Sequence, residues 1–291
     1  MRKIKFILPF ALSSLLFLGA CRGGENKQEE SSAEEFEYTE AEQEESSEEG
    51  EQTQYFLPSA LQIGSVFQKS GLKYYEGIVN SPLNVEKYDT KNSMLLNFGG
   101  YSADLAYCVL NGQNQIALNQ MKALRGLAEG IGMSSIFNSE TLFNKFENNL
   151  GNQDSVIEVM VQIQENIDMF IDDNNMQSMA NIMFAGAWIE GMYIGVKATS
   201  NEEETQITGR LIEQMVILDN LVKAISSVEN KSGNLEEIEK SLISLRDYFN
   251  NLEEIKGKQN INYKEVEIGI DKLKEIANRV VKMRNSIVEP S

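Results

Sequence analysis

Two acidic side chains within strongly apolar stretches of the sequence are the best candidates for chemistry. Asp104 and Glu190 each interrupt a run of apolar and small residues, and a carboxylate in such surroundings must be paired, hydrogen-bonded or protonated. If the two meet, they form either a general acid/base pair or an oxygen-ligand site for a cation. The structural alternative is that each accepts hydrogen bonds from a tyrosine hydroxyl, a lysine or a loop amide and fixes the register of its helix.

The two acids belong to a pattern that occurs twice. The pattern is a glycine, an acidic residue and a tyrosine at fixed spacing. It occurs first as Gly100, Asp104 and Tyr107, and again 86 residues later as Gly186, Glu190 and Tyr193. The repeat predicts a domain built from two related helical halves, and glycines at this spacing allow two helix backbones to approach closely. We therefore predict a buried polar site made of Asp104, Glu190, Tyr107 and Tyr193.

A second candidate site combines aromatic and basic side chains in the first loop. Lys69, Lys73, Tyr74 and Tyr75 lie close together in the sequence, and a pocket lined by tyrosine and lysine suits an acidic or sugar-like ligand. The alternative is that these aromatic rings pack in the core and clamp the loop, as aromatic side chains often do.

Several kinds of catalysis are not expected from this composition. The chain contains no histidine, which is the commonest general base and transition-metal ligand. Cys108 is the only thiol after Cys21 and lies in an apolar stretch without a histidine to activate it, so we expect an inert buried thiol. The run Asp172-Asp173-Asn174-Asn175 is interpreted as a helix-end turn instead of a calcium loop. We predict no catalytic residue, metal site or cofactor.

The charge of the chain excludes some partners. Residues 55–291 carry 21 basic and 31 acidic side chains, a net charge of −10. A surface of this sign disfavours nucleic acid as a partner and adsorption of the domain itself to a membrane.

Apolar residues recur at intervals of three and four, and proline is nearly absent after Pro82, so helices should dominate. We predict an all-α fold, a multi-helix bundle or a stack of antiparallel helical hairpins with about eight or nine helices. The expected ranges are 58–69, 91–111, 113–131, 139–149, 155–172, 176–199, 203–229, 234–256 and 264–288. Ser155 and Glu158 suggest a capping box at the start of one of them.

The stretch 179–196 is apolar on nearly all sides and resembles a membrane span. Its three glycines and the embedded Glu190 favour a buried central helix instead. The helix near 91–111 has the same character.

The N-terminus has the pattern of a secretory signal. Basic residues precede an apolar run from Phe6 to Leu18, which is too short for a spanning helix. The run ends in Leu18-Gly19-Ala20-Cys21, which resembles the lipobox of bacterial lipoproteins. The resemblance implies cleavage before Cys21 and attachment of diacylglycerol, and commonly a further acyl chain such as palmitate, to that cysteine. The chain then divides into a signal peptide (1–20), a lipidated tether (21–54) and a helical domain (55–291).

The segment after Cys21 is a predicted spacer. Thirteen glutamates and only two basic residues give residues 21–54 a net charge of −11, and so few apolar side chains cannot offset the entropy of ordering. Lys27-Gln28-Glu29-Glu30 only loosely resembles a surface-sorting signal. We expect an anchor in the outer membrane of a bacterial envelope, with the domain on the periplasmic side or at the cell surface.

A second resemblance concerns the start of the domain. Residues 63–71 and 100–105 look like a group of Bacteroidetes envelope lipoproteins without an assigned activity, and this likeness implies no catalytic residues. We therefore predict a non-enzymatic, membrane-anchored helical protein that binds an envelope protein or a small ligand. The alternatives are a small-molecule or cation binder, or a hydrolase-type enzyme, using Asp104 and Glu190, and a solute-binding lipoprotein built from tetratricopeptide-like repeats.

Overall fold

The computed structural model describes residues 59–137, 140–199, 205–232, 234–259 and 261–289. The predicted signal, Cys21 and the acidic tether lie outside these residues. All of the described residues belong to one compact unit, Gln52–Ser291.

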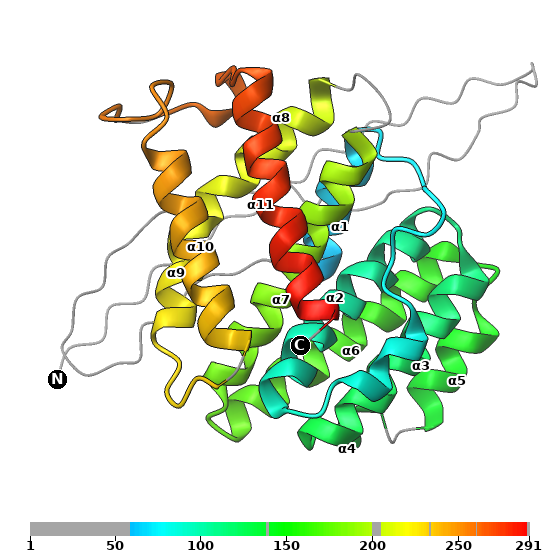
Figure 1. Cartoon of the computed structure of the whole chain (residues 1–291). Helices are drawn as coiled ribbons and strands as arrows, with labels where there is room; N and C mark the ends of the chain where they lie inside the picture. Colours follow the sequence, from blue (N-terminus) through cyan, green and yellow to red (C-terminus); the bar gives the residue numbers. More distant parts are fainter. Residues whose placement is uncertain (1–58, 138–139, 200–204, 233, 260, 290–291) are drawn as a thin grey trace, which may run out of the picture. The chain divides into compact units, whose positions relative to one another are not determined.

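The prediction of an all-helical domain is confirmed, since the described residues form eleven α-helices and three short 3-10 helices and contain no strand (Figure 1). The α-helices are α1 (Ala60–Lys69), α2 (Lys91–Leu110), α3 (Asn114–Ile131), α4 (Ser134–Phe137), α5 (Glu140–Asn148), α6 (Gln153–Asp173), α7 (Gln177–Thr199), α8 (Thr205–Gln214), α9 (Leu218–Ser226), α10 (Asn234–Asn250) and α11 (Ile270–Val288). The 3-10 helices are η1 (Pro82–Lys87), η2 (Met215–Ile217) and η3 (Tyr263–Glu265).

Two apolar helices, α2 and α7, form the centre of the domain and share its most extensive contact. Every residue from Asn181 to Val196 is buried, as predicted for a central helix. No helix in the described part of the chain is long and apolar enough to cross a membrane.

Glycines allow the backbones of α2 and α7 to touch. A Cβ atom on Gly186 would lie 1.8 Å from the carbonyl oxygen of Leu96, and one on Gly99 would lie 1.8 Å from that of Met183. No side chain fits in so small a gap. The sequence pattern correctly placed Gly186 at this crossing, but on α2 it pointed to Gly100, the neighbour of the residue that makes the contact.

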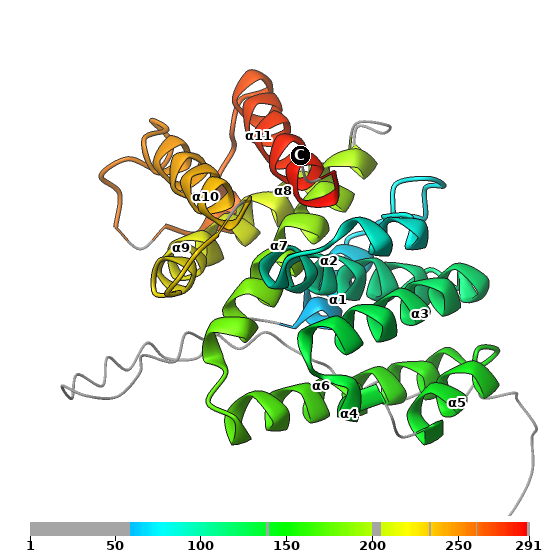
Figure 2. The ribbon, with the colours of Figure 1, turned by 60° about the horizontal axis from the view of Figure 1, so that its bottom comes forward.

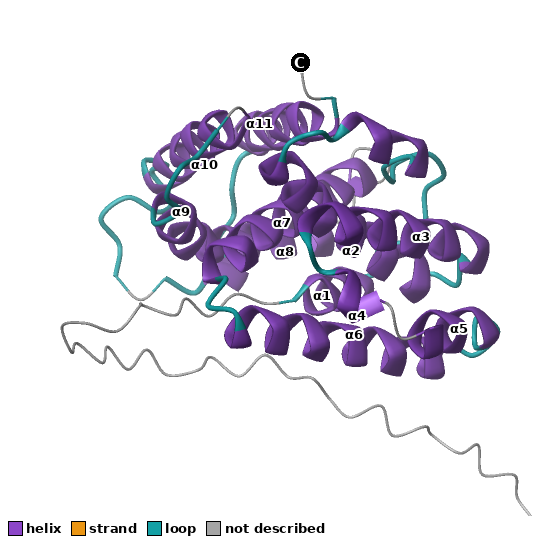
Figure 3. Cartoon of the chain, turned by 90° about the horizontal axis from the view of Figure 1, so that it is seen from below, coloured by secondary structure: helices purple, strands orange, loops and turns teal. Residues whose placement is uncertain are grey.

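The other helices cover this central pair from several sides. Helices α4 and α5 contact α6, which also contacts α2 and α7, and in Figures 2 and 3 these three helices lie together on one side of the pair. On the other side, α10 packs against α9 and α11, and α11 packs against α7. Helix α3 lies along α2, and α1 contacts both central helices.

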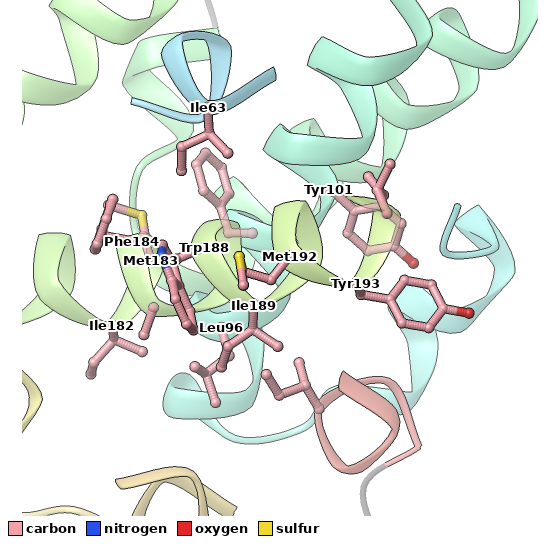
Figure 4. Close-up of a cluster of buried hydrophobic side chains, with 14 of the residues drawn as sticks. Ile63, Leu96, Tyr101, Ile182, Met183, Phe184, Trp188, Ile189, Met192 and Tyr193 are labelled. Carbon is pink, nitrogen blue, oxygen red and sulfur yellow. The ribbon is translucent and has the colours of Figure 1, made fainter. Parts of the chain in front are cut away.

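The core is continuous around α7. Trp188, Ile189 and Met192 are all fully buried and lie between Ile63 of α1 and Leu96 of α2 (Figure 4). The indole N–H of Trp188 donates a hydrogen bond to the carbonyl oxygen of Gln214, at 3.3 Å. Trp188 is the only tryptophan of the chain, so its fluorescence reports the packing of the core.

Some helix boundaries differ from the prediction. The expected helix 203–229 is interrupted at Met215–Ile217, where the chain tightens into η2. The helix expected over 234–256 ends at Asn250, and the one expected over 264–288 begins at Ile270 after Gly269. The predicted capping box of Ser155 and Glu158 is wrong, because Asn152 caps α6 by accepting a hydrogen bond from the Ser155 amide.

Candidate functional site

The predicted acidic residues meet at the interface of the two central helices. Asp104 comes from α2 and Glu190 from α7, with 0 % and 3 % of their surfaces exposed. Their carboxyl groups lie close enough to interact, and burial raises the pKa of both. Gly100 faces this contact, and a Cβ atom on it would lie 3.9 Å from Oε2 of Glu190, an ordinary van der Waals distance. Of the two glycines in the repeated pattern, only Gly186 is therefore required by close packing, at the helix crossing.

An arginine that the sequence pattern did not single out neutralises Glu190. The Nε atom of Arg284, on α11, donates to Oε2 of Glu190 at 3.0 Å, and its Nη2 atom donates to Oε1 at 3.2 Å. Two N–H groups therefore bind one carboxylate, which is a strong and directional arrangement. The guanidinium also lies over the ring of Tyr193, with Cζ 4.3 Å from the ring centre.

Asp104 is held by a loop. The backbone N–H of Asn80 donates to its Oδ2 atom at 2.9 Å, and Oδ1 has no partner among the described residues except the carboxyl of Glu190. Burial and the nearby charge of Glu190 raise the pKa of Asp104 well above its usual value. Burial also raises the pKa of Glu190, but the charge of Arg284 and its hydrogen bonds oppose that rise. Two neighbouring carboxylates disfavour ionisation of both, so the direct ion pair with Arg284 favours the ionised form at Glu190.

Buried amides extend this polar site to Tyr88 and to α3, and add a second contact with α11. The side-chain amide of Asn80 donates to the hydroxyl of Tyr88 at 3.0 Å. The backbone carbonyl oxygen of Asn80 accepts from the side-chain amide of Gln120, on α3, at 3.0 Å. Asn97 of α2 donates to the carbonyl oxygen of Ile287 at 3.0 Å. The network thus ties the loop after α1 and the last turn of α11 to the central helices.

The two predicted tyrosines have different places. Tyr193 belongs to the acid site through its contact with Arg284. Tyr107 does not: its hydroxyl donates to the carbonyl oxygen of Lys73 at 2.8 Å and accepts from the amide of Tyr75 at 2.7 Å. Its ring stacks on Tyr74, with ring centres 5.5 Å apart. Tyr107 therefore clamps the loop that follows α1.

The residues of the predicted basic and aromatic pocket lie around Tyr107 and on the surface beside it. The backbones of Lys73 and Tyr75 are bound by Tyr107, and the side chains of Lys69 and Lys73 are exposed. One hollow of the domain lies under α1 and another between α10 and α11. Neither is lined by Lys69, Lys73, Tyr74 or Tyr75, and neither is lined by Asp104 or Glu190.

Other reactive groups are enclosed as well. Cys108 is fully buried in α2, and burial raises the pKa of its thiol. The run from Asp172 to Asn175 ends α6, with Asn175 at φ +53°, so it is a helix-end turn. Within the described ranges, no three His, Cys, Asp or Glu side chains are grouped so that they could hold a metal ion.

The raised pKa of Asp104 predicts a specific dependence of stability on pH. Because folding raises the pKa of this carboxyl, its contribution to stability is greatest below about pH 4, the usual pKa of aspartate, and is lost as pH rises toward the folded-state pKa. In Asp104→Asn the amide can still donate to Glu190 and accept from Asn80, but it does not ionise. The variant should gain stability relative to the wild type as pH rises, by up to about 1.4 kcal/mol per pH unit.

Urea unfolding followed by Trp188 fluorescence between pH 4 and pH 8 measures this difference. Asp89→Asn, in an exposed loop position, is the control for the loss of a carboxylate outside the acid site. A constant difference between Asp104→Asn and the wild type, or a slope of opposite sign, would show that Asp104 is ionised in the folded protein.

Comparisons of the whole chain with family models, curated proteins and solved structures give no match.

Proposed function

We propose that this chain is a lipid-anchored protein of a bacterial cell envelope whose helical domain binds an envelope protein or a small ligand without catalysing a reaction. The proposed location in the envelope rests on the basic N-terminal residues, the short apolar run and Cys21. Acyl chains contribute about 0.8 kcal/mol for each buried methylene, so a doubly or triply acylated cysteine anchors stably.

The observation that carries the binding role is the enclosure of the most reactive side chains of the domain. Asp104 is buried with a raised pKa, and Glu190 is buried and bound by Arg284. Cys108 is buried within α2. These groups are placed to stabilise the contact of three helices, so recognition falls to the surface of the domain. The acidic tether, with its net charge of −11, is repelled by anionic lipid headgroups and favours display of that surface away from the membrane.

The anchor has a direct test in the full chain expressed in a lipoprotein-processing bacterium. Growth with an alkyne analogue of palmitate should label the wild-type protein and leave Cys21→Ser unlabelled. The variant should also keep its signal and run at a higher mass. Asp104→Asn, which leaves the N-terminus unchanged, is the control and should label like the wild type. Labelling of Cys21→Ser at the wild-type level would contradict the proposed anchor.

An enzyme or cation binder built on Asp104 and Glu190 is the second candidate. The contact between the two carboxyl groups favours it, since adjacent carboxyls with one shared proton are a common acid/base arrangement. A cation at this site would have to compete with Arg284 for Glu190. Thermal unfolding in Ca²⁺, Mg²⁺ or Mn²⁺ separates the candidates. A cation site predicts a rise in Tm that the Glu190→Gln substitution abolishes, whereas the binding role predicts no such rise.

A further inference from the structure

Helices α10 and α11 pack side by side (Figures 1 and 2). A surface hollow lies between them. Its volume is about 380 Å³, which is within the usual range of small-molecule sites. The hollow is lined by Ser244, Asp247, Tyr248, Asn251, Leu252 and Arg279. Five of these six side chains are polar or aromatic with a hydroxyl, so the hollow offers directed hydrogen-bonding groups.

Arg279 is held in one orientation by its neighbours. Its Nε atom donates to Glu275 at 2.7 Å, and its Nη1 atom donates to the hydroxyl of Ser244 at 2.8 Å. The guanidinium lies over the ring of Tyr248, with Cζ 4.7 Å from the ring centre. Among the described residues, its Nη2 atom has no acceptor. The hollow therefore contains a fixed donor group that is available to a ligand.

Asp247, on α10, provides hydrogen-bond acceptors across the hollow from Arg279. Its Oδ1 atom accepts from Nε and Nη2 of Arg246, at 3.0 and 2.8 Å. Its Oδ2 atom receives no hydrogen bond from the described part of the chain, and more than half of the side chain is exposed. The amide nitrogen of Asn251 donates to the backbone carbonyl of Asp247 at 2.7 Å, which leaves the amide oxygen of Asn251 as a second acceptor.

The charges around the hollow are balanced. Arg279 is paired with Glu275, and Asp247 is paired with Arg246. An anionic or cationic ligand would meet a like charge next to each attractive one, so the site favours an uncharged ligand. Donors and acceptors lie beside each other. This combination suits a ligand with adjacent hydroxyl groups.

We propose that the hollow between α10 and α11 binds a neutral carbohydrate, with Arg279 donating to one hydroxyl group and Asp247 accepting from its neighbour. The proposal rests on the proposed binding function and names the ligand class for it. Because the hollow is open and offers few contacts, a single sugar should bind weakly, with a Kd on the order of 1 mM.

Saturation-transfer difference NMR on the full chain, held in a detergent without a sugar headgroup, tests this directly. The probes are methyl α-glucoside, methyl α-galactoside, methyl α-mannoside and methyl N-acetyl-β-glucosaminide. We expect saturation transfer to at least one glycoside, and at least tenfold weaker binding by Arg279→Met and by Asp247→Ala. Arg125→Met removes a matched arginine, whose Cζ lies 5.4 Å from the ring centre of Phe143, and should bind like the wild type.

Trp188 fluorescence and Tm confirm that each variant is folded. Absence of transfer to every glycoside in the wild type, or undiminished binding by folded Arg279→Met, would overturn the proposal. So would a response to sulfate or acetate without a response to glycosides, because it would assign the hollow to anions. If glycosides fail but cross-linking in the envelope still captures a specific partner, the proposed binding function stands and only this ligand class is lost.

Discussion

Replacement of Arg284 by methionine is expected to lower the free energy of unfolding by about 3–5 kcal/mol at neutral pH, the usual cost of leaving one member of a buried ion pair without its partner. Glu190 has 4 % of its side chain exposed and cannot turn to water, whereas Arg284 is 11 % exposed and has a partial route to solvent. Glu190→Gln should therefore destabilise the protein less than Arg284→Met.

A double-mutant cycle makes this prediction specific. The variant Arg284→Met/Glu190→Gln carries no unpaired charge, so it should be more stable than Arg284→Met alone. The decrease in the free energy of unfolding caused by Arg284→Met should also be smaller at pH 5 than at neutral pH, because Glu190 takes up a proton more easily there. Urea unfolding by Trp188 fluorescence gives all four values, with Arg125→Met as the matched surface control. Additive effects of the two substitutions would mean that the ion pair is not formed.

Substitution of Gly186 by alanine is expected to have the second largest effect, about 3 kcal/mol or more. The new methyl group would lie 1.8 Å from the carbonyl oxygen of Leu96, so α2 and α7 must separate. Gly99→Ala meets the same obstacle at the carbonyl oxygen of Met183 and should behave alike. Separation of these helices also pulls Asp104 from Glu190, so the variant should lose the pH dependence assigned to Asp104.

Gly209 supplies the control for this substitution. It lies within α8, and a Cβ atom added there meets nothing within 4 Å. Gly209→Ala should gain up to about 1 kcal/mol from helix propensity alone. Chemical denaturation of the two variants beside the wild type measures both effects. A Gly186→Ala protein as stable as the wild type would contradict the close backbone contact.

The existence of most helices was predictable from the sequence because their packing faces follow the helical repeat. Leu235, Ile238, Leu242 and Leu245 recur at threes and fours and are all fully buried in α10. The break at Met215–Ile217 was not predictable in this way. No glycine or proline marks it, and it lies next to Gln214, whose carbonyl oxygen accepts the hydrogen bond of Trp188. The break thus coincides with a contact from a distant helix, which a local sequence pattern does not contain.

The candidate site was predictable in part. Asp104 and Glu190 stand out because a charge in an apolar helix needs a partner. Their partner Arg284 looked like one more basic residue of an amphipathic helix. A local signal was present, since Arg284 follows Val280 by four positions and precedes Ile287 by three, which places it on the buried stripe of α11. The contribution of Asn80 carried no such signal, because loop positions have no repeat.

The most direct test of the central claim is photo-cross-linking of the lipidated full chain in its own envelope, comparing the wild type with Asp104→Asn and Cys21→Ser. If the anchor sets the location and the buried acids only stabilise the fold, Asp104→Asn should give the same cross-linked product as the wild type and Cys21→Ser should lose it. Loss of the product in folded Asp104→Asn would show that the acid pair is itself the functional site. An unchanged product with Cys21→Ser would show that the lipid anchor is not needed.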